Sequence, residues 1–211
     1  MAKLYFKFGA MGSSKTAQAL MTKFNYEEKG KHVLLIKPAT DTRDDHRDEQ
    51  GNVHTIVRSR IGLFAEALAV GPDVNIRTLF QQRNEQSPLD VLICDECQFL
   101  SPDQVGQMKD LADLDDIPVL CFGLRADFQT KLFPGSKRLF EIADSITEIK
   151  SVCRCGRKAT VNARFDDDGR IIVVGDQVVL GGNDRYEGLC YNCYRKLIYE
   201  SGQQLVYLSL V

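Results

Sequence analysis

Residues 9–16 (Gly-Ala-Met-Gly-Ser-Ser-Lys-Thr) have the residue types and spacing of a phosphate-binding loop. Backbone N–H groups in such a turn converge on an anion, and the first turn of the following helix adds positive charge. Lys15 is therefore expected to neutralise the β- and γ-phosphates of ATP, and the Thr16 hydroxyl to ligate Mg²⁺. The candidates for ATP binding in this loop are Gly9, Ala10, Met11, Gly12, Ser13, Ser14, Lys15 and Thr16.

Ser14 stands where the consensus G-x-x-x-x-G-K-[ST] has its second glycine. If Ser14 adopts a left-handed backbone conformation there, the cost relative to glycine is about 1–2 kcal/mol. On the residues alone, an ordinary helix start capped by serine or threonine stays open as the alternative.

Two acids, Asp95 and Glu96, directly follow the apolar run at residues 91–94. In phosphate-loop enzymes an acid at this place helps to hold Mg²⁺, and a neighbouring acid acts on the nucleophile. Adjacent residues of a strand point to opposite faces, so the two carboxylates are expected to have different roles. Asp95 is assigned to the metal, and Glu96 is assigned as the general base that accepts a proton from a substrate hydroxyl. Two solvated acids, or the D-E-x-x box of a nucleic-acid-dependent ATPase, are the alternatives.

Four cysteines lie late in the chain as two close pairs, Cys153 with Cys155 and Cys190 with Cys193. Two thiolate pairs from separate turns are the ligands of a tetrahedral structural Zn²⁺. A closed four-thiolate site has no open coordination position, so its expected role is to fold a small domain. Unligated buried cysteines and redox pairs are the alternatives.

Composition limits the class of protein. The chain has 211 residues, of which 44% are hydrophobic, and its formal net charge is −2. This balance argues against nucleic acid or an anionic membrane as the main partner. No apolar run reaches the ~20 residues of a membrane span, and the N-terminal residues do not have the pattern of a secretory signal. Seven cysteines fit a secreted disulfide framework poorly. A cytoplasmic protein is expected.

The elements that must position these residues alternate along the chain. Strands are expected at residues 3–8, 32–37, 53–58, 75–78, 91–94, 118–124 and 145–150, and helices at 16–28, 63–69, 102–114 and 137–143. The charged segment 40–52 is expected to be a long loop. The alternation predicts an α/β fold with a mainly parallel sheet flanked by helices. After residue 150 the chain changes to short strands, glycines and paired cysteines, so domains are expected at 1–150 and 151–211.

Together these features resemble the type II, zinc-containing thymidine kinases, and in particular their bacterial branch, in which a C-x-C pair replaces a C-x-x-C pair. The resemblance covers nearly the whole chain. It rests on GAMGSSKT (9–16), DTR (41–43), DECQFL (95–100), GLRADFQTKLF (123–133), CRCGRK (153–158) and GGNDRYEGLCYNC (181–193).

The resemblance implies a phosphate-loop NTPase-type sheet and a small C-terminal zinc-binding domain that carries a lasso loop (165–189) and a C-terminal helix. It implies transfer of the γ-phosphoryl group of ATP to the 5′-hydroxyl of thymidine and deoxyuridine, giving the 5′-monophosphate in deoxynucleotide salvage. A homotetramer or dimer, and feedback inhibition by thymidine triphosphate, are further implications.

The family's functional residues map onto this sequence position by position. Glu96 matches the catalytic base, and Asp41 and Arg43 match a pair near the phosphates and the reacting hydroxyl. Asp95, Cys97 and Gln98 are expected to help to hold the nucleotide and metal. The expected thymidine contacts are Met11, Phe99, Leu124, Phe128, Phe133, Val179, Gly181 and Tyr186. Without the resemblance, Met11 and the phenylalanines would be assigned to the core.

Two readings compete with a nucleoside kinase. A nucleic-acid-binding ATPase with a zinc ribbon would also use an acidic pair after a strand and two cysteine pairs. A nucleotide-binding regulatory protein without catalysis would explain the serine at position 14.

Overall fold

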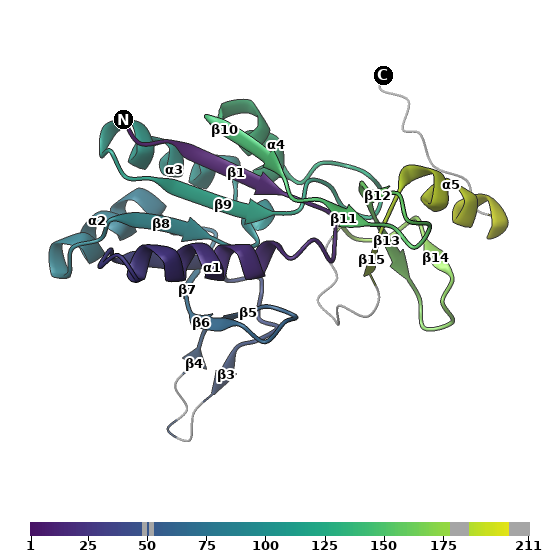
Figure 1. The fold of residues 1–211 in the computed structure, drawn as a ribbon, viewed down its shortest axis with the longest axis horizontal. Coiled ribbons are helices and arrows are strands. Elements are labelled where there is room, and N and C mark those ends of the chain that lie inside the picture. Colours follow the sequence, from purple (N-terminus) through teal and green to yellow (C-terminus); the bar gives the residue numbers. More distant parts are fainter. Residues whose placement is uncertain (48–49, 51–52, 178–185, 203–211) are drawn as a thin grey trace.

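The computed structural model describes residues 1–47, 50, 53–177 and 186–202 (Figure 1). Its centre is a six-stranded sheet in the order β10-β1-β9-β8-β2-β7, in which all neighbouring strands are parallel. The strands are β1 (Leu4–Phe8), β2 (Val33–Pro38), β7 (Leu68–Val70), β8 (Val91–Cys94), β9 (Val119–Gly123) and β10 (Ser145–Glu148). The expected α/β fold with a mainly parallel sheet is confirmed.

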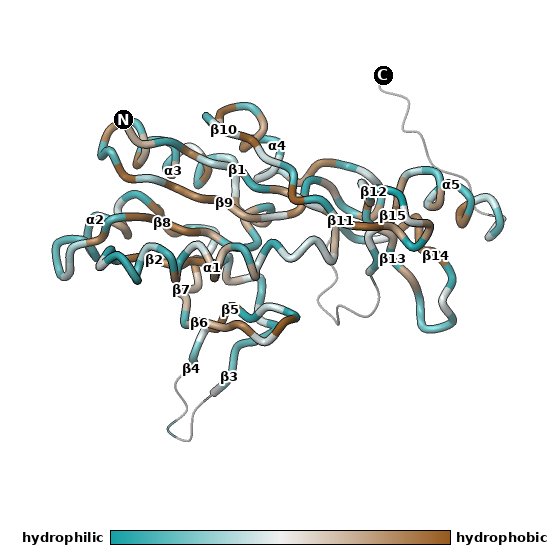
Figure 2. Tube along the Cα trace, in the orientation of Figure 1, coloured by the Kyte–Doolittle hydropathy of each residue, from teal (hydrophilic) through white to brown (hydrophobic). Residues whose placement is uncertain are grey.

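Helices cover both faces of this sheet, which explains why its central strands β8 and β9 are continuously apolar and buried (Figures 1 and 2). The helix α1 (Lys15–Glu27) packs on one face through Ala19 and Leu20. The other face is covered by α2 (Ile76–Gln86), α3 (Pro102–Leu114) and α4 (Pro134–Ile142). In β1, Leu4 and Phe6 point to this second face.

Local sequence explains where the helices begin. The side chain of Ser101 accepts from the backbone N–H of Gln104, whose side chain accepts from the N–H of Ser101. This capping box, with Pro102 in the first turn, starts α3 at the expected residue.

The expected helix 63–69 and strand 75–78 are wrong. Residues 64–66 form β6 (Phe64–Glu66), which pairs with β5 (Ile56–Arg58) in a hairpin, and residues 68–70 form β7. Gly62, with φ of 87°, allows the hairpin to turn. Residues 76–78 instead begin α2, because the side chain of Asn75 accepts from Thr78 N and caps a helix whose Ile76 and Phe80 are buried.

The segment 40–52 is not wholly a loop. It contains β3 (His46–Arg47), which pairs with β4 (Val53–His54), while residues 48, 49, 51 and 52 lie outside the described part. The expected strand 53–58 is thus divided into β4 and β5.

Small antiparallel elements follow the parallel sheet and lie beyond the carboxyl ends of its strands (Figure 1). They are β11 (Ser151–Val152), β12 (Lys158–Ala159), β13 (Val161–Phe165), β14 (Ile171–Ile172), β15 (Tyr186–Leu189) and the helix α5 (Tyr191–Glu200). Ala163, Leu189, Tyr194 and Ile198 belong to their own apolar cluster. Within the described residues, no helix is both long and apolar enough to cross a membrane.

Candidate active site

The loop between β1 and α1 has a shape that only small residues allow. A Cβ atom on Gly9 would lie 2.3 Å from Ser13 Oγ and 2.5 Å from the carbonyl oxygen of Ile149. Gly12 has φ of 75°, which favours glycine. The backbone N–H of Met11 donates to Asn162 Oδ1 at 2.8 Å. The loop is therefore held in a defined conformation at the start of α1.

Lys15 lies within this loop and is 8% exposed. Its ammonium donates to the carbonyl of Ala10 at 3.0 Å and to Ser13 Oγ at 3.3 Å. Burial lowers the pKa of Lys15, and the charges of Glu96 and Asp95 act in the opposite direction. This ammonium is the cation that a bound anion would meet at the helix start.

Ser14, which replaces the consensus glycine, has the left-handed backbone conformation considered above, with φ of 60° and ψ of 30°. Its carbonyl still accepts the first helical hydrogen bond, from Gln18 N at 3.0 Å. The serine therefore adopts the conformation that the consensus glycine provides, and the strain is present before any ligand binds.

Replacing Ser14 by glycine is expected to raise the free energy of unfolding by up to about 1 kcal/mol, because glycine has no left-handed penalty. The KM for ATP should stay within about threefold of the wild-type value, since the loop already has its binding conformation and the strain is the same in free and bound protein. Denaturant unfolding and steady-state kinetics measure the two quantities. Ser14→Val, which adds strain at the same position, is the matched control and should lower stability. A large fall in ATP KM in Ser14→Gly would show that the serine impairs the loop.

A pocket lies over the start of α1, and a hairpin forms its second wall. Gly12, Ser14, Lys15 and Thr16 line it from the loop, and Arg58, Ser59 and Arg60 line it from the β5–β6 hairpin. These hairpin residues were missed in the sequence, because a helix was expected at 63–69. The available signal in the sequence was a pair of arginines, Arg58 and Arg60, shortly before the turn residue Gly62. The pocket thus gathers cationic side chains and helix N–H groups where a polyphosphate would bind.

Asp95 directly follows β8 and turns toward the phosphate loop. It is 3% exposed, and its carboxylate is hydrogen-bonded to the side chain of Thr16. Burial, and then the charge of Glu96, raise the pKa of Asp95 to about 7. A hydroxyl and a carboxylate in contact are the oxygen donors that Mg²⁺ prefers, so this pair fits the metal.

The affinity for Mg²⁺·ATP is expected to increase as the pH rises through about 7. A carboxyl with a raised pKa is protonated below that pH and becomes a metal ligand only above it. Calorimetric titration with a non-hydrolysable ATP analogue and Mg²⁺ between pH 5.5 and 8.5 measures the effect. Asp95→Asn should bind more weakly and lose the part of the pH dependence due to Asp95. An identical profile in wild type and variant would remove Asp95 from the metal site.

Glu96 directly follows Asp95 and has a left-handed backbone, with φ of 51°. Arg43 Nη2 donates to Glu96 Oε1 at 2.6 Å, and Gln98 Nε2 donates to Glu96 Oε2 at 2.5 Å. Asp41 accepts from Arg43 Nε at 2.6 Å. Although burial opposes it, the charges of Glu96 and Asp41 raise the pKa of Arg43. The carboxylate of Glu96 is thus held from two sides, by Arg43 and by Gln98.

A second pocket opens on the other side of Glu96. Its lining is largely apolar with a few polar groups, as in small-ligand sites. Six of the eight residues expected to contact thymidine line it: Met11, Phe99, Leu124, Phe128, Phe133 and Tyr186. Val179 and Gly181 lie outside the described residues. Phe99 and Phe133 form one wall by edge-to-face contact, with ring centroids 5.6 Å apart.

The pocket also contains polar residues that the sequence reading missed. Asp127, Asn162 and Gln177 line it together with Asp41 and Arg43. Asn162, on β13, is 4% exposed and donates from Nδ2 to the carbonyl of Ala126 at 2.7 Å, while its Oδ1 accepts from the phosphate loop. One amide therefore joins the two pockets. An asparagine within a short strand carries no signal of this role.

Not every expected ATP contact lines the phosphate pocket. Cys97 is fully buried in the core, and Gln98 lines the second, largely apolar pocket, where its Oε1 accepts from Leu124 N at 2.9 Å. Gly9, Ala10 and Ser13 shape the loop without lining that pocket. Glu96 and Met11 line both pockets and mark the place where these meet.

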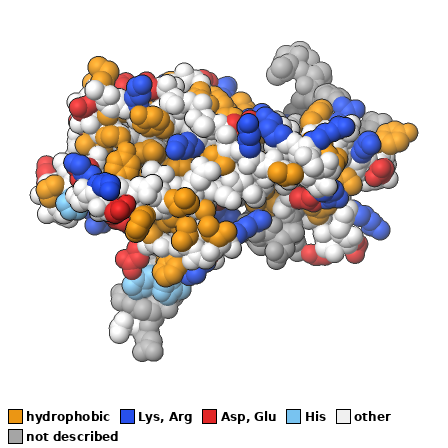
Figure 3. Space-filling view, viewed as in Figure 1, with side chains coloured by type: hydrophobic (Ala, Val, Ile, Leu, Met, Phe, Trp, Pro, Cys, Tyr) orange, Lys and Arg blue, Asp and Glu red, His pale blue; other side chains and the backbone are white. Residues whose placement is uncertain are grey.

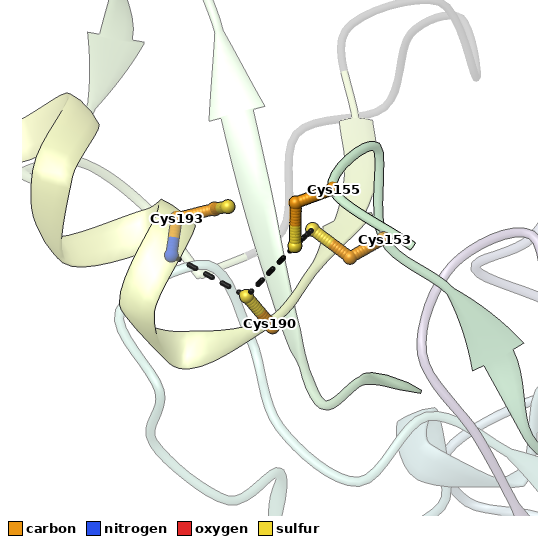
Figure 4. A group of neighbouring side chains, drawn as sticks. All are labelled: Cys153, Cys155, Cys190 and Cys193. Atoms are coloured by element: carbon orange, nitrogen blue, oxygen red, sulfur yellow. Dashed lines mark hydrogen bonds between the residues drawn. The ribbon is translucent and has the colours of Figure 1, made fainter. Parts of the chain in front are cut away.

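The four late cysteines come together at one point (Figure 4). Cys153 and Cys155 lie in the turn after β11, and Cys190 and Cys193 lie at the start of α5. The Sγ atom of Cys155 is 3.6 Å from the Sγ atom of Cys153 and 3.6 Å from that of Cys190. All four sulfur atoms lie within 4.8 Å of one another. Zn–S bonds of about 2.3 Å in a tetrahedron separate the sulfurs by about 3.8 Å. The four thiols therefore fit a zinc ion.

The pKa values of the cysteine thiols differ within the cluster. Burial raises the pKa of Cys153, but the N–H groups of Cys155 and Cys190 outweigh it and lower the value to about 7. Hydrogen bonding to the Cys155 and Cys190 thiols raises the pKa of Cys193 to about 12. A bound cation would offset the repulsion between thiolates placed this close together.

The parallel sheet, the loop at the start of α1 and the acids after β8 define a phosphate-loop nucleotide-binding protein of the α/β class. The thymidine kinase family model matches residues 2–194. The chain belongs to the thymidine kinase family.

Individual relatives extend over almost the full chain. The thymidine kinase of Zymomonas mobilis is 44% identical over 190 residues, which is 90% of this chain and 94% of that protein. The thymidine kinase of Rhodopirellula baltica is 39% identical and covers 96% of this chain and 92% of that protein. The Vibrio cholerae thymidine kinase is 41% identical, with coverage of 94% and 99%.

Proposed function

We propose that this chain transfers the γ-phosphoryl group of ATP to the 5′-hydroxyl of thymidine, and of deoxyuridine, to give the 5′-monophosphate in deoxynucleotide salvage. The observation that carries the proposal is the position of Glu96, which lines both the phosphate pocket and the largely apolar pocket. A nucleoside in the second pocket can present a hydroxyl at that carboxylate. Membership of the thymidine kinase family supplies the substrate class.

Glu96 is the general base in this proposal. Its carboxylate accepts the proton of the 5′-hydroxyl as the oxygen attacks phosphorus, while Arg43 and Gln98 keep it oriented. Lys15 and the N–H groups at the start of α1 neutralise the phosphate charge, and Arg58 and Arg60 close the pocket from the hairpin. Positioning and charge neutralisation carry most of the catalysis in phosphoryl transfer.

Thr16 and Asp95 would hold Mg²⁺, which neutralises phosphate charge and orients the transferred group when bound. The hydrogen bond between their side chains brings the two oxygen donors together. Asp41 would keep Arg43 directed at the reacting hydroxyl, since it accepts from Arg43 Nε.

Zinc would serve folding rather than chemistry, because four thiolates leave no open coordination position. We place an ATP-binding domain at residues 1–150 and a zinc-binding domain with the lasso loop at 151–211. Cys190 directly follows β15, which carries Tyr186 and pairs with the strand of Asn162, so the zinc would fix part of the nucleoside pocket. Val179, Gly181 and Tyr186 would close over thymidine.

Oligomer, regulation and location are further parts of the proposal. Exposed apolar side chains gather over α1 and the β5–β6 hairpin (Figure 3). Met21, Phe24 and Phe64 are each more than half exposed, and such a patch is typical of an association surface. We place a second copy of the chain there, in a homotetramer or dimer. Feedback inhibition by thymidine triphosphate and a cytoplasmic location complete the proposal.

Purified protein incubated with labelled ATP, Mg²⁺ and a panel of nucleosides tests the function directly. Phosphorylation of thymidine and deoxyuridine, but of no purine nucleoside, is the expected result. ATP hydrolysis stimulated by a polynucleotide, without nucleoside phosphorylation, would support a nucleic-acid-dependent ATPase instead. ATP binding with neither activity would indicate a regulatory protein.

A further inference from the structure

Lys37, in β2, is among the most deeply buried side chains of the structure, with 1% of its surface exposed. Its ammonium donates to the carbonyl of Ile56 at 3.0 Å, and lies 2.8 Å from Asp45 Oδ1 and 3.9 Å from Asp41 Oδ2. An ammonium is strongly hydrated, so its burial requires acceptors that replace water. The phosphoryl-transfer mechanism described above does not use this residue.

The acceptors of Lys37 come from two segments, the loop 41–45 and the strand β5. These segments are also joined directly, since Asp45 Oδ1 accepts from Ile56 N at 3.3 Å. The ammonium, the carboxylate and the backbone of Ile56 thus form a closed set of contacts. Removing the ammonium would leave the carboxylate of Asp45 with only the backbone N–H in this set.

Each segment carries charges to the reacting site. Asp41 holds Arg43, which donates to Glu96 at 2.6 Å. The strand β5 ends at Arg58, and the turn after it contains Arg60; both line the phosphate pocket. The distance between these two groups of charges therefore depends on how the loop 41–45 is attached to β5.

We propose that Lys37 is a positioning residue for phosphoryl transfer. Its buried ammonium fixes the distance between Arg43 and the two hairpin arginines, Arg58 and Arg60, so that arginines from both segments reach one phosphoryl group. The inference rests on the proposed function, because it assumes that a phosphoryl group lies between them. Lys37 lines neither of the two pockets. A displacement of about 1 Å from a distant change can lower a rate by about 100-fold.

Lys37→Met tests the proposal. The expected result is a fall in kcat of about 10- to 100-fold and an increase of at least about fivefold in the Kd of Mg²⁺ with a non-hydrolysable ATP analogue. The Kd of thymidine without ATP should change by less than about threefold, since the apolar walls Phe99, Leu124 and Phe133 lie outside the segments that Lys37 joins. The matched control is Lys109→Met. Lys109, on α3, pairs with Asp113 and Asp144 at 2.7 Å away from both pockets, so all three constants should stay near wild type.

Asp45→Asn and the double variant Lys37→Met/Asp45→Asn keep the test decisive if the single variant does not fold. Asp45→Asn should weaken nucleotide binding in the same direction by a smaller factor. The double variant removes both opposite charges, so it should regain stability without regaining nucleotide affinity. Wild-type nucleotide Kd and kcat in the double variant would overturn the proposal, because Lys37 would then serve stability alone. If wild-type protein bound the nucleotide without phosphorylating thymidine, the proposed function would fail, while the nucleotide Kd would still test Lys37.

Discussion

Glu96→Gln is expected to lower kcat for thymidine phosphorylation by roughly 100-fold or more, the usual contribution of a positioned base. Glutamine is almost the same size and keeps an oxygen that accepts from Arg43, but it cannot take the proton of the 5′-hydroxyl. The KM for thymidine should change little, since the walls of the pocket are untouched. Steady-state kinetics at saturating ATP measures both constants.

Glu141→Gln is the matched control. Glu141 lies on α4 and pairs with Arg138 at 3.0 Å near the surface, so the same chemical change there should leave kcat near wild type. A Glu96→Gln enzyme within about threefold of wild-type kcat would remove Glu96 from the role of base, because loss of a base costs far more than threefold.

Removal of zinc is expected to abolish activity and to unfold the elements after residue 150. Structural zinc supplies an apparent ~10–16 kcal/mol in small zinc-binding units, which is comparable with the ~5–15 kcal/mol total stability of a typical domain. The nucleoside pocket should be lost as well, because β13 and β15 carry Asn162 and Tyr186. Metal analysis, circular dichroism and kinetics before and after chelation measure these effects, and added zinc should restore activity.

Cys190→Ser should reproduce the effect of chelation without a chelator. Cys121→Ser is the control, since Cys121 is a free cysteine buried in the sheet and away from the cluster, and this variant should retain its zinc. A metal-free protein with full activity would contradict a folding role for the ion.

Much of the architecture could be predicted from the sequence, because the buried strands and the capped helices carry local signals. The run 91–94 is fully buried and became β8, and Ser101 and Pro102 marked the start of α3. The region 53–78 could not be predicted in the same way. Its strands are two or three residues long, too short to show a period, and Asn75 lies next to apolar residues that suit a strand as well as the helix that it caps.

Some residues of the candidate site could likewise be predicted from the sequence, and others could not. Residues within continuous motifs, such as Lys15 and Glu96, could be predicted, since their spacing reflects one local turn. Arg60, Asn162 and Lys37 could not, because their relevance comes from contacts between segments far apart in the chain. Such contacts depend on the assembled fold and leave no local pattern.

Asn162 has a consequence for biosynthesis. Its amide bridges the backbone of Met11 and the carbonyl of Ala126, so the phosphate loop and the nucleoside pocket are joined by a residue from the last third of the chain. A nascent polypeptide that has emerged only as far as the parallel sheet lacks this bridge. The contacts that join the phosphate loop to the nucleoside pocket can therefore form only after synthesis has extended past β13.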